Sequence, residues 1–357
     1  MAAIDSYLRR LVELGGSDLH FLAGDPPRVR VNGDLRSLDD KPLDAKTAQE
    51  LLEEILSPAA RKALDDHDGA DFAHDIEGVG RFRVNVLRQL NGMGGVFRAI
   101  PSSAKTLQEL AMPSVVYSLC KHKNGLILVT GKTGSGKSTT LAAMVDAINR
   151  RLKGHIVTIE DPIEFVHPRR SCLISQREVG VHTQSFADAL RSALREDPDV
   201  ILVGELRDLE TMSIAVTAAE MGILVMGTLH TNGAAPTVDR IVNAFPTDKQ
   251  SHIRTMLATS LRGVISQQLI PTVDQKGRVA ALEIMVNNSG VSNLIRQGKL
   301  DQLENAIQSG AASGMQTMDG ALMQLYKSLK ITGDEAYQKS ISKPKFESLK
   351  GTGAYGR

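Results

Sequence analysis

The sequence is poor in aromatic residues, in cysteine and in net charge, and each shortage argues against a class of protein. Aromatic residues are 4% of the 357 residues and the formal net charge is +1. Few aromatic side chains are therefore available to stack on bases, and there is little net positive charge to bind a phosphate backbone. The two cysteines, Cys120 and Cys172, do not make a disulfide framework and are typical of a reducing compartment. We therefore expect neither a nucleic-acid partner nor a disulfide-stabilised secreted domain.

The sequence also lacks long apolar runs. None reaches the ~18 residues of a membrane span, and the N-terminal MAAIDSYLRR does not have the basic-then-apolar layout of a secretory signal. A hydrophobic share of 42% and a charged share of 23% are ordinary for a globular protein. The sequence predicts a soluble, cytoplasmic protein with room for two or three domains.

Residues 1–100 have the pattern of a small α+β domain. The chain opens with an amphipathic helix that places Ile4, Leu8 and Leu11 on one face. The following elements are expected after it: strands at Asp18–Leu22, Arg28–Val31, Gly80–Leu87 and Gly94–Ile100, and a helix at Ala45–Leu56. A linker is expected at residues 101–112, with a helix starting inside it at Thr106–Lys121.

Residues 113–290 have a different pattern, in which apolar runs of five to seven residues alternate with helical stretches. The runs are Gly125–Thr130, His155–Ile159, Asp199–Val203, Ile223–Thr228 and Ala280–Val286. Continuous apolar strands between helices indicate the buried strands of a parallel sheet that is covered on both faces. The sequence therefore predicts an α/β core here.

Residues 291–357 are expected to form a helical extension that ends in a basic tail. Residues 327–357 hold seven Lys/Arg and three Asp/Glu, a net charge of +4. The favoured interpretation is a solvated, partly disordered tail, and a binding arm is the alternative.

Residues 131–138, GKTGSGKS, match the phosphate-loop pattern G-x-x-x-x-G-K-[ST] at every fixed position. A predicted strand precedes the loop and a predicted helix follows it, as the pattern requires. Glycines let the backbone N–H groups converge on phosphates, and the helix N-terminus adds positive potential. Lys137 is expected to reach the β- and γ-phosphates, and Ser138 to bind Mg²⁺. The predicted nucleotide-binding residues are Thr133, Gly134, Ser135, Gly136, Lys137, Ser138 and Thr139.

Two of the predicted strands end in acidic residues, which nucleotide hydrolysis would need to bind metal and to orient water. Glu160, Asp161 and Glu164 follow the strand at 155–159, and Glu205 follows the strand at 199–203. Because the carboxyl ends of strands line the ligand crevice of a doubly wound sheet, we expect both groups to face the phosphate loop. His230 follows a third strand. The pattern alone leaves a structural role and a γ-phosphate contact equally open for this histidine.

Four segments together resemble the secretion ATPase superfamily. They are GKTGSGKST (Walker A), TIEDPIEF (Asp box), DVILVGELRD (an atypical Walker B) and GTLHTN (His box). The resemblance implies that Glu164 is the general base and that Glu205 is the acid associated with Mg²⁺. It also implies that His230 senses the γ-phosphate, with Glu160 and Asp161 supporting their box.

Within the superfamily the resemblance narrows to the pilus retraction ATPases, PilT and its paralogue PilU, and covers nearly the whole chain. The matching segments are GGSDLH at 15–20, GRFRVN at 80–85, HIRTMLATSLRGVISQQLI at 252–270 and GMQTMD at 314–319. It implies a PAS-like first domain, a RecA-like P-loop core and a helical C-terminal extension. Extension ATPases and type II secretion ATPases carry a four-cysteine zinc site, which the two cysteines of this chain cannot form.

The resemblance also implies that the first domain supplies arginines to the nucleotide of a neighbouring subunit. Arg83 and Arg98 match, and Arg81 is a second-rank candidate on the same strand face. A guanidinium at the γ-phosphate would offset transition-state charge, whereas strand-edge arginines are otherwise usually solvated. Ser292 is a departure, because it replaces an arginine of the family's AIRNLIREGK stretch that is linked to retraction rather than to hydrolysis. The departure bears on how the C-terminal segment couples hydrolysis to work and not on hydrolysis itself.

The function implied is that of one protomer in a homohexameric ring that hydrolyses ATP with Mg²⁺ to depolymerise and retract type IV pili. Such a ring would act on an inner-membrane pilus platform protein, peripheral to that membrane, and could work beside a paralogous ATPase. The alternatives are a PilU-like accessory or other secretion-ring ATPase, a nucleic-acid translocase and a non-hydrolysing nucleotide switch. Low net charge disfavours the translocase, and the acidic and histidine elements disfavour the switch.

Overall fold

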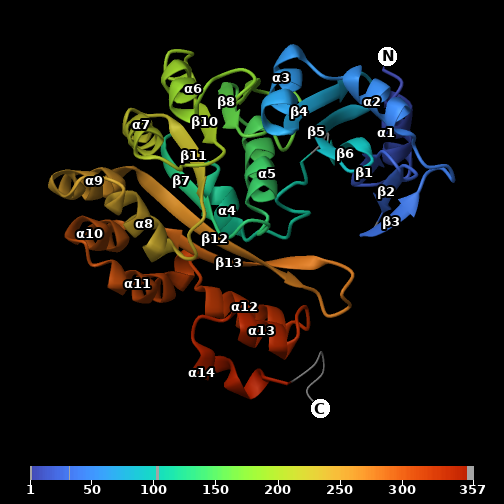
Figure 1. Cartoon of the computed structure of the whole chain (residues 1–357). Coiled ribbons are helices and arrows are strands. Elements are labelled where there is room, and N and C mark those ends of the chain that lie inside the picture. The colour runs from blue at the N-terminus through green and yellow to red at the C-terminus, as the bar shows by residue number, and fades with distance from the viewer. Residues whose placement is uncertain (1, 32, 102–103, 352–357) are drawn as a thin grey trace. The chain divides into compact units, whose positions relative to one another are not determined.

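The computed structural model describes residues 2–31, 33–101 and 104–351. The chain divides into two compact units: Met1–Ser103 with the short segment Glu164–Val166, and Ala104–Ile163 with His167–Arg357. Each unit has its own sheet and its own hydrophobic core (Figure 1). Residues 102–103 of the predicted linker lie outside the described residues, and the finer division of the second unit remains a prediction. Among the described residues, no helix combines the length and the apolarity needed to cross a membrane.

The first unit is built on a six-stranded sheet in the order β3-β2-β1-β6-β5-β4, in which all neighbours are antiparallel. Its strands are β1 (Asp18–Leu22), β2 (Arg28–Val31), β3 (Asp34–Ser37), β4 (Gly69–Ile76), β5 (Gly80–Gln89) and β6 (Gly92–Ile100). Its helices are α1 (Asp5–Glu13), α2 (Ala45–Glu53) and α3 (Pro58–His67). The sequence did not predict β3, β4 or α3, whose polar residues leave no clear periodicity.

Alternation along β5 shows how this sheet separates its two faces. Phe82, Val84 and Val86 are fully buried, whereas the interleaved Arg81 and Arg83 are not. Since successive side chains of a strand point to opposite faces, the apolar set enters the core and both arginines lie on the other face.

The second unit is built on a seven-stranded sheet in the order β13-β12-β7-β11-β10-β8-β9. Its strands are β7 (Gly125–Thr130), β8 (His155–Glu160), β9 (Leu173–Glu178), β10 (Val200–Val203), β11 (Leu224–Leu229), β12 (Leu261–Pro271) and β13 (Arg278–Val286). All neighbours are parallel except β12 and β13. The parallel sheet predicted from the apolar runs is therefore confirmed in its centre, and it ends in an antiparallel edge strand. The carboxyl ends of β7, β11, β10 and β8 lie on one edge of the sheet.

Helices cover both faces of this sheet (Figure 1). They are α4 (Ser114–Leu119), α5 (Lys137–Asn149), α6 (Phe186–Ala193), α7 (Leu209–Glu220), α8 (Ala234–Asn243), α9 (Thr247–Ser260), α10 (Ser289–Gln297), α11 (Leu303–Ser309), α12 (Met318–Lys327), α13 (Gly333–Lys339) and α14 (Lys343–Phe346). Along β7, Leu126 and Leu128 pack in one core with α6–α11, while Ile127 and Val129 pack in the other with α4 and α5. β7 is thus buried on both sides.

The helix predicted at Thr106–Lys121 is wrong over its first half. Only Ser114–Leu119 is α-helical, and the chain turns before it, with Ala111 at a φ of 51°. Pro113 explains the break, because a proline disfavours the helical conformation of the residue before it.

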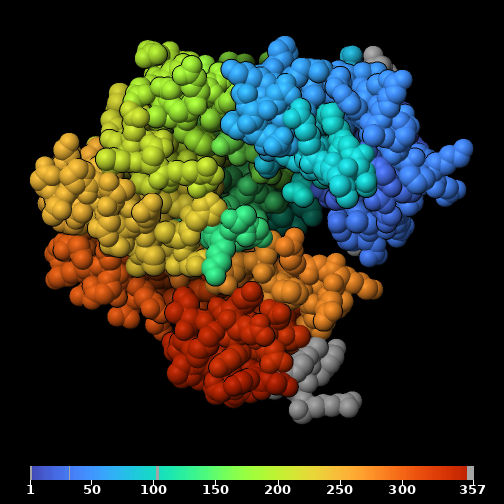
Figure 2. All heavy atoms as spheres, viewed as in Figure 1, coloured from blue at the N-terminus to red at the C-terminus, as the bar shows by residue number. Residues whose placement is uncertain are grey.

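The solvated tail predicted from residue 327 is also wrong as far as residue 351. The segment folds into α13 and α14 and packs on the β12–β13 hairpin, where its residues Ile331, Ala336 and Phe346 are at most 1% exposed. Figure 2 shows this segment in red, gathered into one lobe beside the orange hairpin. A net charge describes the surface of such a segment but not its few apolar residues, which are spaced to meet the hairpin. Residues 352–357 lie outside the described residues.

Candidate active site

The phosphate loop joins β7 to α5 and contains three glycines at positive φ. Gly131, Gly134 and Gly136 have φ values of 138°, 77° and 88°, which only glycine adopts readily. A side chain at Gly131 would also clash with the Gln267 carbonyl, and one at Gly136 would come within 2.7 Å of Gln267 Nε2. The loop therefore needs glycine both for its curl and for the close approach of β12.

Gln267 of β12 holds the phosphate loop in place. Its side chain is buried, and Nε2 donates to the Ser135 carbonyl at 2.6 Å while Oε1 accepts from Thr140 Oγ1 at 2.7 Å. One amide thus connects the loop to the first turn of α5. Sequence reasoning missed this residue, although a paired glutamine within an otherwise apolar stretch was a signal for it.

Lys137 lies inside the loop and is 9% exposed. Its Nζ donates to the carbonyls of Gly131 at 2.8 Å and Lys132 at 3.1 Å. Burial lowers the pKa of Lys137, and the nearby negative charge of Glu205 opposes that shift. The ammonium group is therefore held at the loop by two backbone carbonyls, and the charge of a carboxylate that follows another strand favours its protonated form.

Glu205 and His230 meet at the carboxyl ends of β10 and β11. Glu205 Oε1 lies 3.2 Å from His230 Nε2, and Oε2 lies 2.8 Å from Arg207 Nη2. Burial alone would raise the pKa of Glu205, but the hydrogen bonds and positive charges of Arg207 and His230 outweigh it and lower the pKa. The strand ends thus present an ionised carboxylate that contacts the histidine and whose negative charge acts on the buried lysine of the loop.

The donor set at the loop fits a magnesium ion that arrives with a nucleotide. Ser138 is exposed in the first turn of α5, and Glu205 is ionised. Mg²⁺ is usually held by one or two carboxylates together with substrate phosphates and water. Among the described residues, no group of three or more His, Cys, Asp or Glu side chains is arranged to hold a metal without such help.

The Asp box lies further along the sheet. Glu160 ends β8, which is the third strand away from β7 or about 14 Å at the usual strand spacing. It is buried and accepts a hydrogen bond from Thr158 Oγ1 at 2.7 Å. Asp161 and Glu164 are exposed, and Glu164 belongs to the segment grouped with the first unit. The role of Glu164 as general base stays a prediction.

The first unit presents two arginines side by side. Arg83 of β5 and Arg98 of β6 are direct cross-strand partners, and their side chains are 45% and 68% exposed. Each has a carboxylate nearby, because Arg83 Nε lies 3.9 Å from Asp71 Oδ1 and Arg98 Nε lies 2.8 Å from Asp18 Oδ1. Arg81 is 16% exposed and pairs with Asp75 at 3.3 Å, which leaves it less available.

Asp18 gives the GGSDLH segment a structural role at this pair. It lies opposite Arg98 in the β1–β6 register and accepts from Arg98 Nε at 2.8 Å. Asp18 is buried and also accepts from Ser17 Oγ at 2.7 Å. Burial raises the pKa of Asp18, yet the bonds to Ser17 and Arg98 dominate and the pKa lies below its ordinary value. The carboxylate thus fixes the Nε edge of Arg98 and leaves the guanidinium tip exposed.

Comparison with known proteins identifies the family of this chain. The model of the family described as "Type II/IV secretion system protein" matches residues 2–340 of this chain. The chain belongs to this family. It is 51% identical over 326 residues to the type IV pilus retractation ATPase PilT of Pseudomonas aeruginosa, which covers 91% of this chain and 94% of that protein. Like the other members it resembles, the chain is an ATPase.

Two further relatives bear on the narrower resemblance. The type IV pilus ATPase PilU of Pseudomonas aeruginosa is 41% identical over 332 residues, covering 93% of this chain and 87% of that protein. The crystal structure of the pilus retraction motor PilT with bound ADP has a TM-score of 0.90 at 45% identity, covering 98% of this chain and all of that chain. The predicted fold class and family are therefore confirmed.

Ser292 has a local role where the family pattern has arginine. Its hydroxyl donates to the Ala258 carbonyl at 2.7 Å and lies 3.0 Å from Asn287 Oδ1. It thereby joins the start of α10 to the end of α9. The serine is part of the packing between these helices.

Proposed function

We propose that this chain is the ATP-hydrolysing motor subunit that drives retraction of type IV pili, and thus twitching motility. The observation that carries the proposal is a glycine-shaped phosphate loop in which the buried Lys137 feels the negative charge of Glu205, the carboxylate that His230 contacts. Similarity to a pilus retraction ATPase over 91% of the chain supplies the biological context.

In this proposal the loop N–H groups and Lys137 bind the phosphates of ATP. Ser138 and Glu205 hold Mg²⁺, which neutralises phosphate charge when bound. Glu164 orients the attacking water and accepts its proton. His230, held by Glu205, contacts the γ-phosphate. Positioning and charge stabilisation, rather than covalent chemistry, then supply the catalysis.

The site works within a ring. The chain assembles as a homohexamer in which Arg83 and Arg98 of one subunit offset charge at the nucleotide of the next. Hydrolysis changes the conformation of the subunits in the ring, and these changes act on the inner-membrane platform protein of the pilus. A paralogous ATPase can take part. Exposed cross-strand arginines support this proposal, because two guanidinium groups side by side on one face suit a bound phosphate.

The deciding experiment is complementation of a strain that lacks its retraction ATPases. The wild-type gene should restore twitching, and Lys137→Ala should not, because it removes the buried ammonium from the loop. Purified wild type should hydrolyse ATP, and Glu164→Ala should not. Restored twitching by Lys137→Ala at normal protein levels would refute the motor assignment.

A PilU-like accessory ATPase is the second candidate, favoured by the 41% identity to PilU. The same strain separates the two candidates. An accessory ATPase restores twitching only when a PilT-type paralogue is also present, whereas an independent motor restores it alone.

The arginine proposal has its own test in mixed rings. Arg83→Ala and Glu164→Ala protomers, each inactive alone, should recover part of the ATPase activity when mixed, because some interfaces then carry both intact residues. Arg81→Ala is the matched control on the same strand face and should keep more activity. Absence of recovery at every mixing ratio would contradict action between subunits.

A further inference from the structure

The proposed mechanism leaves one wall of the phosphate-loop site unused. A pocket of about 480 Å³ has residues 132–135 of the loop on one side and Gln338, Lys339 and Ile341 on the other. The latter three belong to the end of α13 and the turn before α14. The pocket lies wholly within the second unit.

The charge of this pocket is positive. Lys132 and Lys339 line it, and none of its described lining residues carries a carboxylate. Neither lysine forms an ion pair with a described residue. Two uncompensated ammonium groups beside a phosphate loop raise the local concentration of anions and suit a phosphate-bearing ligand.

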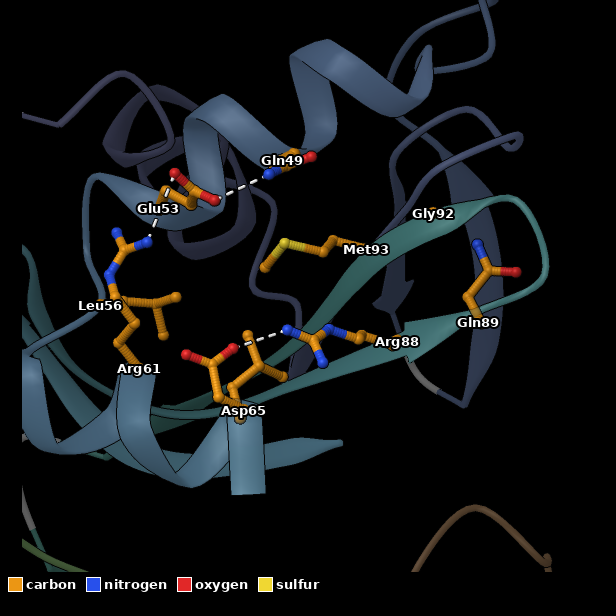
Figure 3. A pocket seen from close by; sticks show the side chains of 10 residues that line it. Gln49, Glu53, Leu56, Arg61, Asp65, Arg88, Gln89, Gly92 and Met93 are labelled. Atoms are coloured by element: carbon orange, nitrogen blue, oxygen red, sulfur yellow. Dashed lines mark hydrogen bonds and ion pairs between the residues drawn. The ribbon is translucent and has the colours of Figure 1, made fainter. Parts of the chain in front are cut away.

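A pocket in the first unit shows the opposite arrangement. It measures about 260 Å³ and lies between α2, α3 and the β5–β6 turn (Figure 3). Its arginines are neutralised within the pocket: Arg88 pairs with Asp65 at 2.7 Å and Arg61 with Glu53 at 3.6 Å. The lysines of the phosphate-loop pocket, by contrast, have no carboxylate partner among the residues that line it.

The turn that carries the second wall is firmly held. Asp319 of α12 accepts from the backbone N–H groups of Ile341 at 2.7 Å and Ser342 at 3.0 Å. Lys343 Nζ donates to the carbonyls of Tyr337 at 2.7 Å, Gln338 at 2.9 Å and Ser340 at 2.9 Å, which satisfies the end of α13. Lys339, the last residue of α13, therefore has a fixed backbone position, although the basic composition of its segment predicted a solvated tail.

Asp319 belongs to the GMQTMD segment, for which the proposed mechanism gives no role. Gln316 of this segment forms a backbone bridge with Ile284 of β13, and Thr317 caps α12 by accepting from the Gly320 N–H. Asp319 follows within the first turn of α12 and reaches the pocket wall. The segment thus connects the sheet edge to the α13–α14 turn through a short, hydrogen-bonded path.

We propose that the α13–α14 turn is a nucleotide-contacting wall of the ATP site. Lys339 binds phosphate oxygens of the nucleoside di- or triphosphate, and Asp319 is the positioning residue that places it. This inference rests on the proposed ATPase function and adds a contact from the C-terminal segment to it. Ile341, 61% exposed, supplies apolar surface on the same wall.

The test is ADP binding by titration calorimetry on the full-length protein at several salt concentrations. Lys339→Gln should weaken ADP binding about 3- to 10-fold, since one charge-assisted contact is lost, and should flatten the salt dependence. Lys345→Gln is the matched control, because it removes the same charge from exposed α14 outside the pocket. Equal ADP affinity and equal salt dependence for wild type and Lys339→Gln would overturn the proposal.

Asp319→Asn tests the positioning role. It should weaken ADP binding as much as Lys339→Gln, and the double variant should be no weaker than either single variant, because both changes remove one contact. Melting temperatures measured alongside separate this from a structural effect. A lower melting temperature with unchanged ADP affinity would overturn the role of Asp319.

The experiments distinguish failure of the proposed nucleotide contact by Lys339 from failure of the proposed ATPase function. If wild type binds ADP and hydrolyses ATP while Lys339→Gln binds ADP equally well, only the C-terminal contact is refuted. If wild type itself binds no ADP, the ATPase function is refuted and the contact with it.

Discussion

Replacing Gln267 by methionine should show how much the stability of the second unit depends on one amide. Methionine has similar volume but removes both hydrogen bonds, so the Ser135 carbonyl and the Thr140 hydroxyl lose their partner. Both residues are at most 6% exposed. Each buried group left unsatisfied costs about 1–3 kcal/mol, so the loss of both partners should lower the unfolding free energy by about 2–6 kcal/mol. For a unit of this size that corresponds to a melting temperature lower by about 5–15 °C.

Thermal unfolding without nucleotide, followed by circular dichroism, measures this effect. Gln268→Met is the matched control, because it makes the same change one residue along β12 at a half-buried side chain without a hydrogen bond to any described residue. Thr140→Val removes one bond only and should fall between the two. ADP affinity should also drop for Gln267→Met, since the Ser135 backbone is no longer held. If Gln267→Met melts within about 1 °C of Gln268→Met, the bracing argument is wrong.

Three further predictions concern side chains away from the loop. Burial lowers the pKa of His167 to about 4, below the ordinary 6.5. Its neutral form therefore adds stability that is complete above pH ~6.5 and is lost as pH falls towards 4, about 2 kcal/mol by pH 5. Urea unfolding should show this slope in wild type and not in His167→Gln. Burial raises the pKa of Cys120 to about 12 and also raises that of Cys172, so a thiol reagent at pH 8 should label neither in the folded chain and both after denaturation. Asp18→Asn should lower ATP turnover in the same direction as Arg98→Ala, and full turnover by Asp18→Asn with loss by Arg98→Ala would contradict the anchoring role.

The fold could be predicted where strands are continuous and apolar. β7, β8, β10 and β11 are such strands, and each was predicted within one residue of its observed bounds. β9 and β12 were not predicted, because polar residues interrupt LISQRE and LRGVISQQLIP. β13 was predicted as a strand, yet an apolar run carries no sign of its direction, and its antiparallel pairing with β12 depends on the connecting hairpin.

The phosphate loop could be predicted because its chemistry is local. The backbone curl that binds phosphates requires glycines at fixed spacing, and these are visible in eight consecutive residues. Glu205 and His230 required one further step, the rule that carboxyl ends of parallel strands share an edge, and the structure brings these two residues to within 3.2 Å of each other. Glu164 remains a prediction at this level, because its segment belongs with the first unit.

The residues that hold the site could not be predicted in this way, because their partners are distant in sequence. Gln267 binds a loop carbonyl 132 positions earlier, and Asp319 binds an amide 22 positions later. Neither spacing has a periodic or motif signature. The basic composition of residues 327–357 also gave no sign of the position of Lys339. The same net charge is compatible with a solvated tail and with a folded segment that lines a pocket. What distinguishes them is the set of apolar residues that pack on the hairpin, together with Asp319, which fixes the turn. Variants that tune nucleotide affinity are therefore expected at these distant contacts as well as in the motif itself.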